Sequence, residues 1–370
     1  MLIRRTSLGA SFIVLALVVS LGARAIAAET YHPIRTTTPP VIDGKLDDSI
    51  WTVAPRLTNF KTFIPDYGKL IDEQTVAMAA YDDENLYFGF RCYEPDPSKI
   101  KTSISSRDNI TSDDWVCVNL DPFNDHQGLF CFYTNPNGIQ ADSHFANNNE
   151  DFSIDLVWYS AGHIDSLGYT LEVQIPLKSI RYADGDPVTM GVVFERYISR
   201  RSEHSSYPEL DPAKGGAFAT QMMPMAYTGV KHYPLVELLP AITYGQHYSA
   251  QNGSIRQDSS AGKFSFTGKY GVTSNLILDG TYNPDFSQVE SDAGQVDINL
   301  RYSLFYPEKR PFFLEGRDNF NIAAMAITPV SQLDPIQSVL NTRNIVDPLV
   351  GVKLSGKVGD NGTLASLYTL

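Results

Sequence analysis

Cysteine, charged side chains and long apolar runs are all scarce in this sequence. Three cysteines, at positions 92, 117 and 131, are too few for a disulfide scaffold and lack the CxxC spacing of zinc sites. Charged residues make up only 19% of the chain, and the net charge of −13 makes nucleic acid an unfavourable partner. The seven histidines include no pair at i and i+4, so no metal ligand is assigned to them. The GxSxG, HExxH and phosphate-loop motifs are also missing, which removes the commonest sequence signs of a catalytic site.

The first 27 residues have the layout of a secretory signal peptide. They begin with MLIRR, continue through the apolar run FIVLALVVSLGA and end at the small-residue pattern Ala25-Ile26-Ala27. An uncleaved anchor is the alternative, but the apolar run is short for a membrane helix and a cleavage pattern follows it closely. We therefore expect the mature chain to be secreted across the inner membrane.

Residues 33–229 alternate apolar and polar side chains in short runs separated by clusters of Asp, Asn, Gly and Pro. NLYFGFRCYE, at 85–94, places Leu86, Phe88 and Phe90 on one side of a strand, and GYTLEVQIP, at 168–176, repeats the pattern. No stretch of similar length in this region shows the apolar spacing of a helix. The predicted fold of this region is therefore all-β, an antiparallel β-sandwich.

One predicted hairpin brings two cysteines together. The strand-like runs DDWVCVNLD and GLFCFYT flank the turn-rich segment DPFNDHQG. Folding this hairpin about residue 124 places Cys117 opposite Cys131. The two residues are predicted either to form a cross-strand disulfide or to lie together as buried thiols.

From about residue 233 the alternating runs become longer and richer in aromatic residues. Examples are KFSFTGKYG at 263–271, NLILDGTYN at 275–283, QVDINLRYS at 295–303 and VGVKLSGKV at 350–358. This pattern is typical of outer-membrane β-barrels, although a soluble sandwich alternates in the same way. Residues 233–370 hold roughly five or six strand candidates, and the smallest single-chain barrels need eight. We expect the N-terminal part of a longer antiparallel barrel, which the end of the chain truncates.

Two stretches that contain proline interrupt this region, NPDFSQVESD at 283–292 and FYPEKRPFFLEG at 305–316. Proline removes a hydrogen-bond donor from a central strand, so both stretches are predicted to be loops or strand ends. Their charged residues include both signs at close spacing, which predicts ion pairs inside a polar lumen or at its mouth.

The residues also resemble two known families. The motifs VIDGKLDDSIWTVAP, AYDDENLYFGFRCYEPDP, SDDWVCVNLDP and GYTLEVQIPLKSI occur in this order and resemble family 9 carbohydrate-binding modules over about residues 40–200. YNPDFSQVESDAGQVDINL and FYPEKRPFFLEG resemble an outer-membrane barrel family of unknown function, in which such a module precedes the barrel. The resemblance implies a sandwich followed by a transmembrane barrel, with membrane lipid as a partner. It also implies a place in the outer membrane or periplasm of a Gram-negative-type bacterium. The residues of this barrel signature are Asn283, Pro284, Asp285, Phe286, Glu290, Glu308, Arg310, Pro311, Phe312 and Glu315.

Glycan binding in such modules depends on aromatic rings that stack on a sugar and on polar side chains that bind its hydroxyl groups. The family's clamping tryptophans are not at their expected positions. Thr111 stands near one, Tyr207 is the only aromatic residue near the other, and Cys131 stands near the expected arginine. If the strand order follows the family, the predicted carbohydrate site consists of Arg107, Trp115, Asn147, Arg196 and Tyr207. The alternative is that Trp115, Trp158 and Tyr207 are ordinary core aromatics.

Calcium is the one cofactor that the sequence brings into consideration. Asp82 with Asp83, and Asp121 with Asn124 and Asp125, form oxygen-rich clusters of the kind a hard cation accepts. Neither cluster has EF-hand spacing. Solvated turns are the alternative explanation of both.

The leading hypothesis is a non-enzymatic carbohydrate-binding protein of the cell envelope, linked to carbohydrate catabolism through a glycan partner. The first alternative is a glycoside hydrolase acting on O-glycosyl bonds, with Glu308 and Glu315, or Asp285 and Glu290, as the paired carboxylates. The second alternative is an outer-membrane transport or secretion pore gated by the sandwich.

Overall fold

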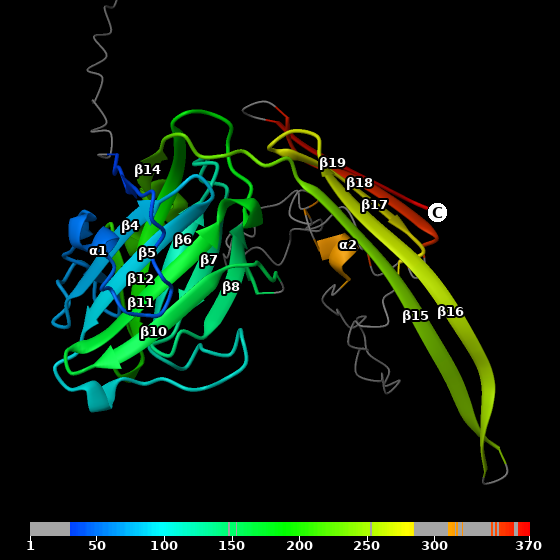
Figure 1. Ribbon diagram of the computed structural model, residues 1–370, viewed down its shortest axis with the longest axis horizontal. Helices are drawn as coiled ribbons and strands as arrows, with labels where there is room; N and C mark the ends of the chain where they lie inside the picture. The colour runs from blue at the N-terminus through cyan, green and yellow to red at the C-terminus, as the bar shows by residue number, and fades with distance from the viewer. Residues whose placement is uncertain are drawn as a thin grey trace, which may run out of the picture.

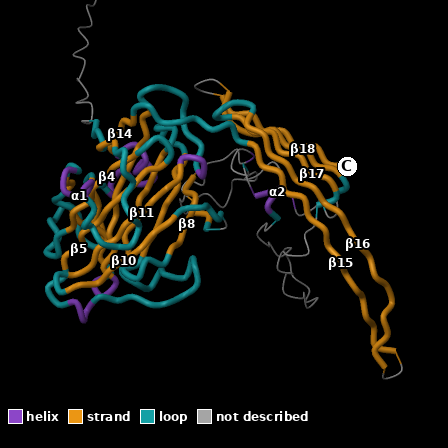
Figure 2. Tube along the Cα trace, viewed as in Figure 1, coloured by secondary structure: helices purple, strands orange, loops and turns teal. Residues whose placement is uncertain are grey.

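The computed structural model describes residues 30–146, 149–152, 154–251, 254–284, 310–314, 316, 320, 342, 345, 348–358 and 362–370. These residues are almost entirely strands and loops, as Figure 2 shows, so the prediction of an all-β fold is confirmed. Within them no helix is long and apolar enough to cross a membrane. The described α-helices are α1 (Ser49–Val53) and α2 (Pro311–Leu314), and the 3-10 helices are Pro97–Lys99, Leu177–Ser179, Ser199–Arg201 and Pro212–Gln221.

Two facing sheets build the part of the chain that was predicted to be a sandwich (Figure 1). Sheet I has the strand order β1-β4-β5-β11-β10, and β2 also pairs with β4. Its pairs are antiparallel except that β1 runs parallel to β4, which departs from the wholly antiparallel prediction. The strands are β1 (Ile34–Arg35), β2 (Arg56–Leu57), β4 (Thr75–Tyr81), β5 (Asn85–Tyr93), β10 (Tyr159–Asp165) and β11 (Gly168–Pro176).

Sheet II faces sheet I and has the order β3-β13-β12-β6-β7-β8-β9, with β14 paired to one end of β12. Its pairs are antiparallel. The strands are β3 (Lys61–Ile64), β6 (Trp115–Asp121), β7 (Gly128–Thr134), β8 (Gln140–Ala146), β9 (Asn149–Asp151), β12 (Val188–Ile198), β13 (Glu203–Tyr207) and β14 (Met223–Tyr227).

The core between the sheets contains the alternating side chains that the sequence predicts. Leu86, Phe88 and Phe90 of β5 are fully buried there, as are the corresponding apolar residues of β11. Phe194 of β12 meets Phe88 and Phe90 edge to face, with ring centroids 5.7 and 5.5 Å away. Burying a side chain of this kind contributes about 1.5–3 kcal/mol, so these alternating positions hold the two sheets together.

A second apolar cluster covers the outer face of sheet I. Trp51 of α1 packs there with Met78 and Tyr87. A Cβ atom on Gly89 would lie 3.1 Å from the Trp51 ring, so the glycine allows the indole to approach the strand closely. The indole Nε1 donates a 2.7 Å hydrogen bond to Glu172 of β11, which ties the α1 segment to the sheet.

The predicted register of the β6–β7 hairpin is wrong by two residues. Cys117 lies opposite Tyr133, and Cys131 lies opposite Asn119. The turn is displaced because the Asp121 carboxylate accepts hydrogen bonds from the backbone amides of residues 123 and 126. Both cysteines are free and buried, so the structure contains the thiol alternative and not the disulfide. Burial, reinforced by the neighbouring Cys131, raises the pKa of the Cys117 thiol well above its usual value.

Sheet III lies beyond the two facing sheets, and its strands follow one another in the order β15-β16-β17-β18-β19 (Figure 1). The runs predicted at 263–271, 275–283 and 350–358 fall in β16, β17 and β18, whereas the run at 295–303 lies outside the described residues. The strands, all paired antiparallel, are β15 (Val236–Gln251), β16 (Ser254–Gly271), β17 (Leu276–Tyr282), β18 (Val350–Val358) and β19 (Gly362–Thr369).

The register of sheet III separates its side chains into two faces. Ile242 pairs with Phe264, and Phe266 pairs with Tyr282, so even-numbered residues share one face across the strands. That even-numbered face exposes Val236, Leu238, Ile242, Tyr244, Phe264, Phe266, Tyr270, Leu278, Tyr282, Val352, Val358, Leu364 and Tyr368. The odd-numbered face carries a buried ion pair in which Lys353 Nζ lies 3.2 Å from Asp279 Oδ2.

Candidate functional site

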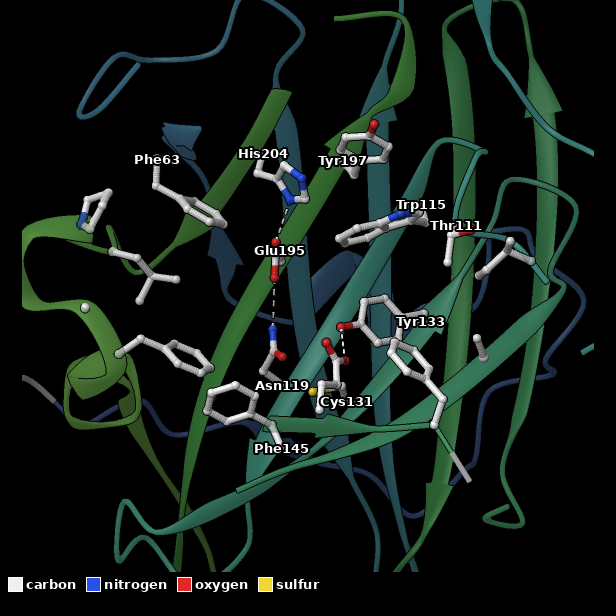
Figure 3. Close-up of a pocket in the computed structure, with 18 of the residues that line it drawn as sticks. Phe63, Thr111, Trp115, Asn119, Cys131, Tyr133, Phe145, Glu195, Tyr197 and His204 are labelled. Carbon is white, nitrogen blue, oxygen red and sulfur yellow. Dashed lines mark hydrogen bonds and ion pairs between the residues drawn. The ribbon is translucent and has the colours of Figure 1, made fainter. Parts of the chain in front are cut away.

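A cavity of about 520 Å³ lies on the face of sheet II that points away from sheet I (Figure 3). Strand alternation creates it: on β12, Glu195 and Tyr197 point into the cavity, while Phe194 and Arg196 point into the core. The 3-10 helix at Pro212–Gln221 supplies part of the wall, including Phe218.

A row of rings crosses three neighbouring strands at one side of this cavity. Trp115 pairs in register with Tyr197, and Tyr197 pairs with His204. The Trp115 and Tyr197 rings are 5.2 Å apart and tilted by 30°, and the Tyr197 and His204 rings are 4.5 Å apart. Tyr133 of β7 meets Trp115 edge-on at 5.0 Å. Cross-strand register therefore builds an aromatic wall.

Polar side chains lie next to this wall in a hydrogen-bonded row, marked by dashed lines in Figure 3. His204 Nδ1 is 2.9 Å from Glu195 Oε1, and Asn119 Nδ2 donates to Glu195 Oε2 at 3.4 Å. Glu195 is thus held in place from both sides, with its side chain still 15% exposed. Such a row offers donors and acceptors to a ligand without first having to be ordered.

A second carboxylate, Glu150, stands at the edge of the cavity. The Tyr133 hydroxyl donates to it at 2.7 Å, and the Ser143 hydroxyl also donates to it. Burial raises the pKa of the Tyr133 phenol well above its usual value, so Tyr133 remains a donor. Phe152, whose ring centroid is 6.1 Å from that of Tyr133, is 43% exposed and forms an accessible part of the rim.

The structure does not bring the five predicted carbohydrate-site residues together. Trp115 lines the cavity. Arg196 and Tyr207 lie on the opposite face of sheet II, where Arg196 is buried and donates to the carbonyl oxygens of Glu73 and Tyr93 at 2.8 and 3.1 Å. Tyr207 packs at the edge of the core, with its ring 6.1 Å from that of Phe60.

Arg107 holds a loop in place and does not line the cavity. Its guanidinium pairs with the buried carboxylate of Asp142 and donates to Gln140 and to the Leu156 carbonyl oxygen at 3.0 and 2.7 Å. Asn147 lies outside the described residues. Trp158, which was weighed as a core aromatic, is buried with its ring 5.3 Å from that of Phe132.

Sequence reasoning missed most of the cavity because both alternating sets of β12 contain large side chains. VVFERYI offers Phe194 and Arg196 on one face and Glu195 and Tyr197 on the other, so the alternation alone does not say which face is the core. One signal did point here. Thr111 and Cys131, near which the family resemblance implied a tryptophan and an arginine, both line the cavity.

The two clusters considered for calcium are occupied by turn contacts. Asp82 accepts hydrogen bonds from the amides of residues 84 and 85 and from the Tyr87 hydroxyl, each at 2.7 Å. Asp121 is fully buried beneath its own turn, and Asp125 pairs with Lys357. Within the described ranges there is no group of three or more His, Cys, Asp or Glu side chains placed to hold a metal ion.

Part of the predicted barrel signature contacts the odd-numbered face of sheet III. Asn283 has a positive φ and donates to the Phe264 carbonyl oxygen at 2.8 Å, and Pro284 follows it. Arg310 is buried, donates to the carbonyl oxygens of residues 342 and 345 at 2.7 and 2.6 Å, and lies over the Phe313 ring.

Pro311 then opens the short helix α2, in which Phe312 approaches Gly351 and accepts a 2.7 Å hydrogen bond from Lys353 through its carbonyl oxygen. The remaining signature residues, Asp285, Phe286, Glu290, Glu308 and Glu315, lie outside the described residues. The predicted ion pairs among the charged residues therefore stay predictions.

Comparison with known proteins gives matches to both parts of the chain. Residues 238–357 match the family described as "Domain of unknown function (DUF5916)". A family 9 carbohydrate-binding module from Caldicellulosiruptor kristjanssonii, solved with glucose, has a TM-score of 0.40 and 16% identity, over 55% of this chain and 98% of that one. The same type of module from that organism, solved with cellotriose, has a TM-score of 0.40 and 18% identity, over 55% and 95%. A search of the curated proteins finds no match to this chain.

Proposed function

We propose that the cavity on sheet II binds a short stretch of glycan, and that the protein is a non-enzymatic, envelope-located binding protein linked to carbohydrate catabolism. The observation that carries the proposal is the cavity's composition: an aromatic wall of Trp115, Tyr133 and Tyr197 stands beside the row of Asn119, Glu195 and His204.

A sugar presents two kinds of surface, and the cavity has a counterpart for each. The C–H faces of a pyranose ring pack on aromatic rings, whereas its hydroxyl groups need both donors and acceptors. Glu195 supplies acceptor oxygens, Asn119 supplies an amide, and His204 has a second ring nitrogen beyond the one that faces Glu195. The volume of about 520 Å³ falls in the range of roughly 300–1,000 Å³ usual for small-ligand sites.

The experiment that tests this proposal is calorimetric titration of the full chain with neutral β-linked glucose and xylose oligomers. The detergent should lack a sugar headgroup, because a maltoside would compete for the cavity. Tyr197→Ala should weaken binding about tenfold, since a stacked ring contributes about 1–1.5 kcal/mol. Tyr159→Ala is the matched control, because Tyr159 is an exposed tyrosine on a strand of sheet I, outside this cavity. Equal losses in the two variants, or no binding of any oligomer, would refute the proposal.

We propose further that sheet III belongs to an outer-membrane barrel, with its even-numbered face against lipid. Two features support this. Large apolar side chains are exposed on that face, with Ile242 84% exposed, and the opposite face holds the buried Asp279–Lys353 pair. A barrel wall needs apolar side chains outside and tolerates polar ones inside.

Arginine substitutions on neighbouring residues test the lipid-facing assignment. Ile242→Arg places a charge on the even-numbered face, where such a charge costs about 2–4 kcal/mol near the middle of a bilayer. Thr243→Arg places the same charge on the other face and is the matched control. We expect Ile242→Arg alone to reduce recovery of the protein in the outer-membrane fraction. Equal recovery of the two variants, or release of the unmodified protein by a salt wash, would contradict the assignment.

A further inference from the structure

The charges around the sheet II cavity all have one sign. Glu150, Glu195 and Asp211 line it, and none of its described lining residues is a lysine or an arginine. The Tyr133 and Ser143 hydroxyls donate to Glu150, the Asn119 amide donates to Glu195, and the backbone amide of Ala213 donates to Asp211. No lysine or arginine of the described chain lies in ion-pair contact with Glu150 or Glu195; the one ion pair found is with the imidazole of His204.

Aromatic rings strengthen the attraction of this cavity for a positive charge. The faces of Trp115, Tyr133 and Tyr197 present negative electrostatic potential, so a cation close to them is stabilised, most strongly by tryptophan. The same rings exclude water, which lowers the screening between a bound cation and the carboxylates. An acidic sugar would instead bring a like charge next to Glu195 and Glu150.

We infer that the cavity selects a saccharide that carries a protonated amine, of the glucosamine type, over neutral and acidic sugars. This inference rests on the proposed glycan-binding function and adds the charge class of the ligand. The amine is expected to lie between Glu195 and the aromatic wall, while the ring and hydroxyl groups use the remaining contacts.

Titration of the full chain with a matched series of sugars tests the inference. The series is the β-1,4 disaccharide of glucosamine, its N-acetylated form, cellobiose and glucuronic acid, each at low and at high salt. We expect the amino sugar to bind about tenfold more tightly than cellobiose, and glucuronic acid to bind weakest. The preference should shrink at high salt, because part of it comes from charge attraction.

Substitution of one carboxylate separates charge from shape. Glu195→Gln keeps the size of the side chain and should clearly lower the affinity ratio of amino sugar to cellobiose, because it removes the carboxylate expected to face the amine. Asp72→Asn removes a carboxylate that is 90% exposed and outside the cavity, and is the matched control that keeps the ratio.

Each remaining outcome overturns a different statement. Equal binding of amino sugar and cellobiose overturns the amine inference and leaves the glycan proposal standing. Binding of tetramethylammonium as tight as that of the amino sugar, or no binding of any sugar, overturns the glycan proposal itself.

A different observation, the connectivity of sheet III, points to the side of the membrane on which the two facing sheets lie. Its strands are joined at one end by residues 272–275 and 359–361 only, and β15 enters at that end after residues 228–235. Ser274 donates to Asp184 at 3.1 Å, and Lys357 pairs with Asp125, so this end faces sheets I and II. At the opposite end β15 and β16 are joined by residues 252–253, and β17 and β18 are separated by residues 283–349, the longest connection in the sheet.

Outer-membrane barrels have short turns on the periplasmic side and long connections on the outer side. We therefore propose, on the basis of the membrane insertion proposed above, that the sandwich lies in the periplasm. Its glycan would then be one that has already crossed the outer membrane or that belongs to the periplasm.

Cysteine labelling in cells with an intact outer membrane tests this orientation. The described native thiols are buried and give little background. A membrane-impermeant maleimide should label Ser254→Cys, at the outer end of β16, in intact cells, and Asp72→Cys only after permeabilisation. Labelling of Asp72→Cys in intact cells would overturn the orientation. If neither variant is labelled until permeabilisation, the membrane insertion on which the orientation rests is wrong.

Discussion

Glu172 provides the sharpest prediction about stability, because its carboxylate is buried where the α1 segment meets sheet I. It accepts hydrogen bonds from Trp51 Nε1 and from the amides of Asp43 and Gly44, at 2.7 to 3.0 Å. Burial, which outweighs these hydrogen bonds, raises its pKa from the ordinary 4.5 to about 7. The folded protein therefore binds a proton at Glu172 more tightly than the unfolded chain does.

The direction and size of the effect follow from that difference. The stabilisation is fully present below about pH 4.5 and is lost as the pH rises to about 7, since the unfolded carboxyl releases its proton first. A shift of this size corresponds to at most about 3 kcal/mol. Relaxation of the surrounding structure around the ionised carboxylate reduces this to about 2 kcal/mol.

Urea unfolding at a series of pH values, followed by tryptophan fluorescence, measures this contribution. Trp51 lies on α1, Trp115 lies on β6, and Trp158 immediately precedes β10 and packs in the core between sheets I and II, so the signal reports that part of the chain. Wild type should lose about 2 kcal/mol more than Glu172→Gln between pH 4.5 and 7. Two parallel profiles would refute the reasoning, whatever the absolute stabilities, because Gln also weakens the bond to Trp51 at every pH.

Three further predictions follow from buried groups. Arg196→Ala should destabilise the sandwich by about 3 kcal/mol or more, because it leaves buried carbonyl oxygens without their donor. The sugar affinity of the folded protein should not change. A loss of affinity in protein that is still folded would show that Arg196 contributes to the binding site. Lys353→Met should destabilise sheet III by about 3–5 kcal/mol, because it leaves the Asp279 carboxylate buried without its ion-pair partner. Heat-modifiable migration would detect the loss, and adding Asp279→Leu should restore part of it. If the double variant shows no rescue, the loss does not come from the ion pair. Alkylation should not modify Cys92, Cys117 or Cys131 until urea is added, since all three thiols are buried. Mass spectrometry measures the modification. Labelling of the native protein would contradict their burial.

Much of the fold could be predicted because the deciding signal is local. On β5 and β11 each strand has one strongly apolar side, so alternation alone identifies the core residues Leu86, Phe88 and Phe90. The strands at 263–271, 275–283 and 350–358 were found for the same reason. The hairpin register was missed because it depends on how the Asp121 carboxylate organises its turn, and a sequence pattern does not contain that geometry.

The candidate site could be predicted only in part because it depends on pairing between distant strands. Trp115, Tyr197 and His204 form one wall only because β6, β12 and β13 are neighbours in a particular register. Residues 197 and 204 are close in the sequence, but 115 is far from both. Trp115 was predicted from its residue type alone and does line the cavity, whereas the rings that form the aromatic wall with it were not predicted.

The neighbours Glu195 and Arg196 show why residue type was a poor guide on β12. An arginine in a sequence met for the first time is read as a ligand contact, yet Arg196 points into the core, where its guanidinium donates to the backbone carbonyl oxygens of Glu73 and Tyr93. Glu195, one residue earlier, points to the other face and meets His204 and Asn119. Strand alternation therefore places the negative charge in the cavity and the positive charge in the core. A register shifted by one residue would exchange the two side chains, so the charge preference that we propose for the ligand depends on which face of β12 packs in the core.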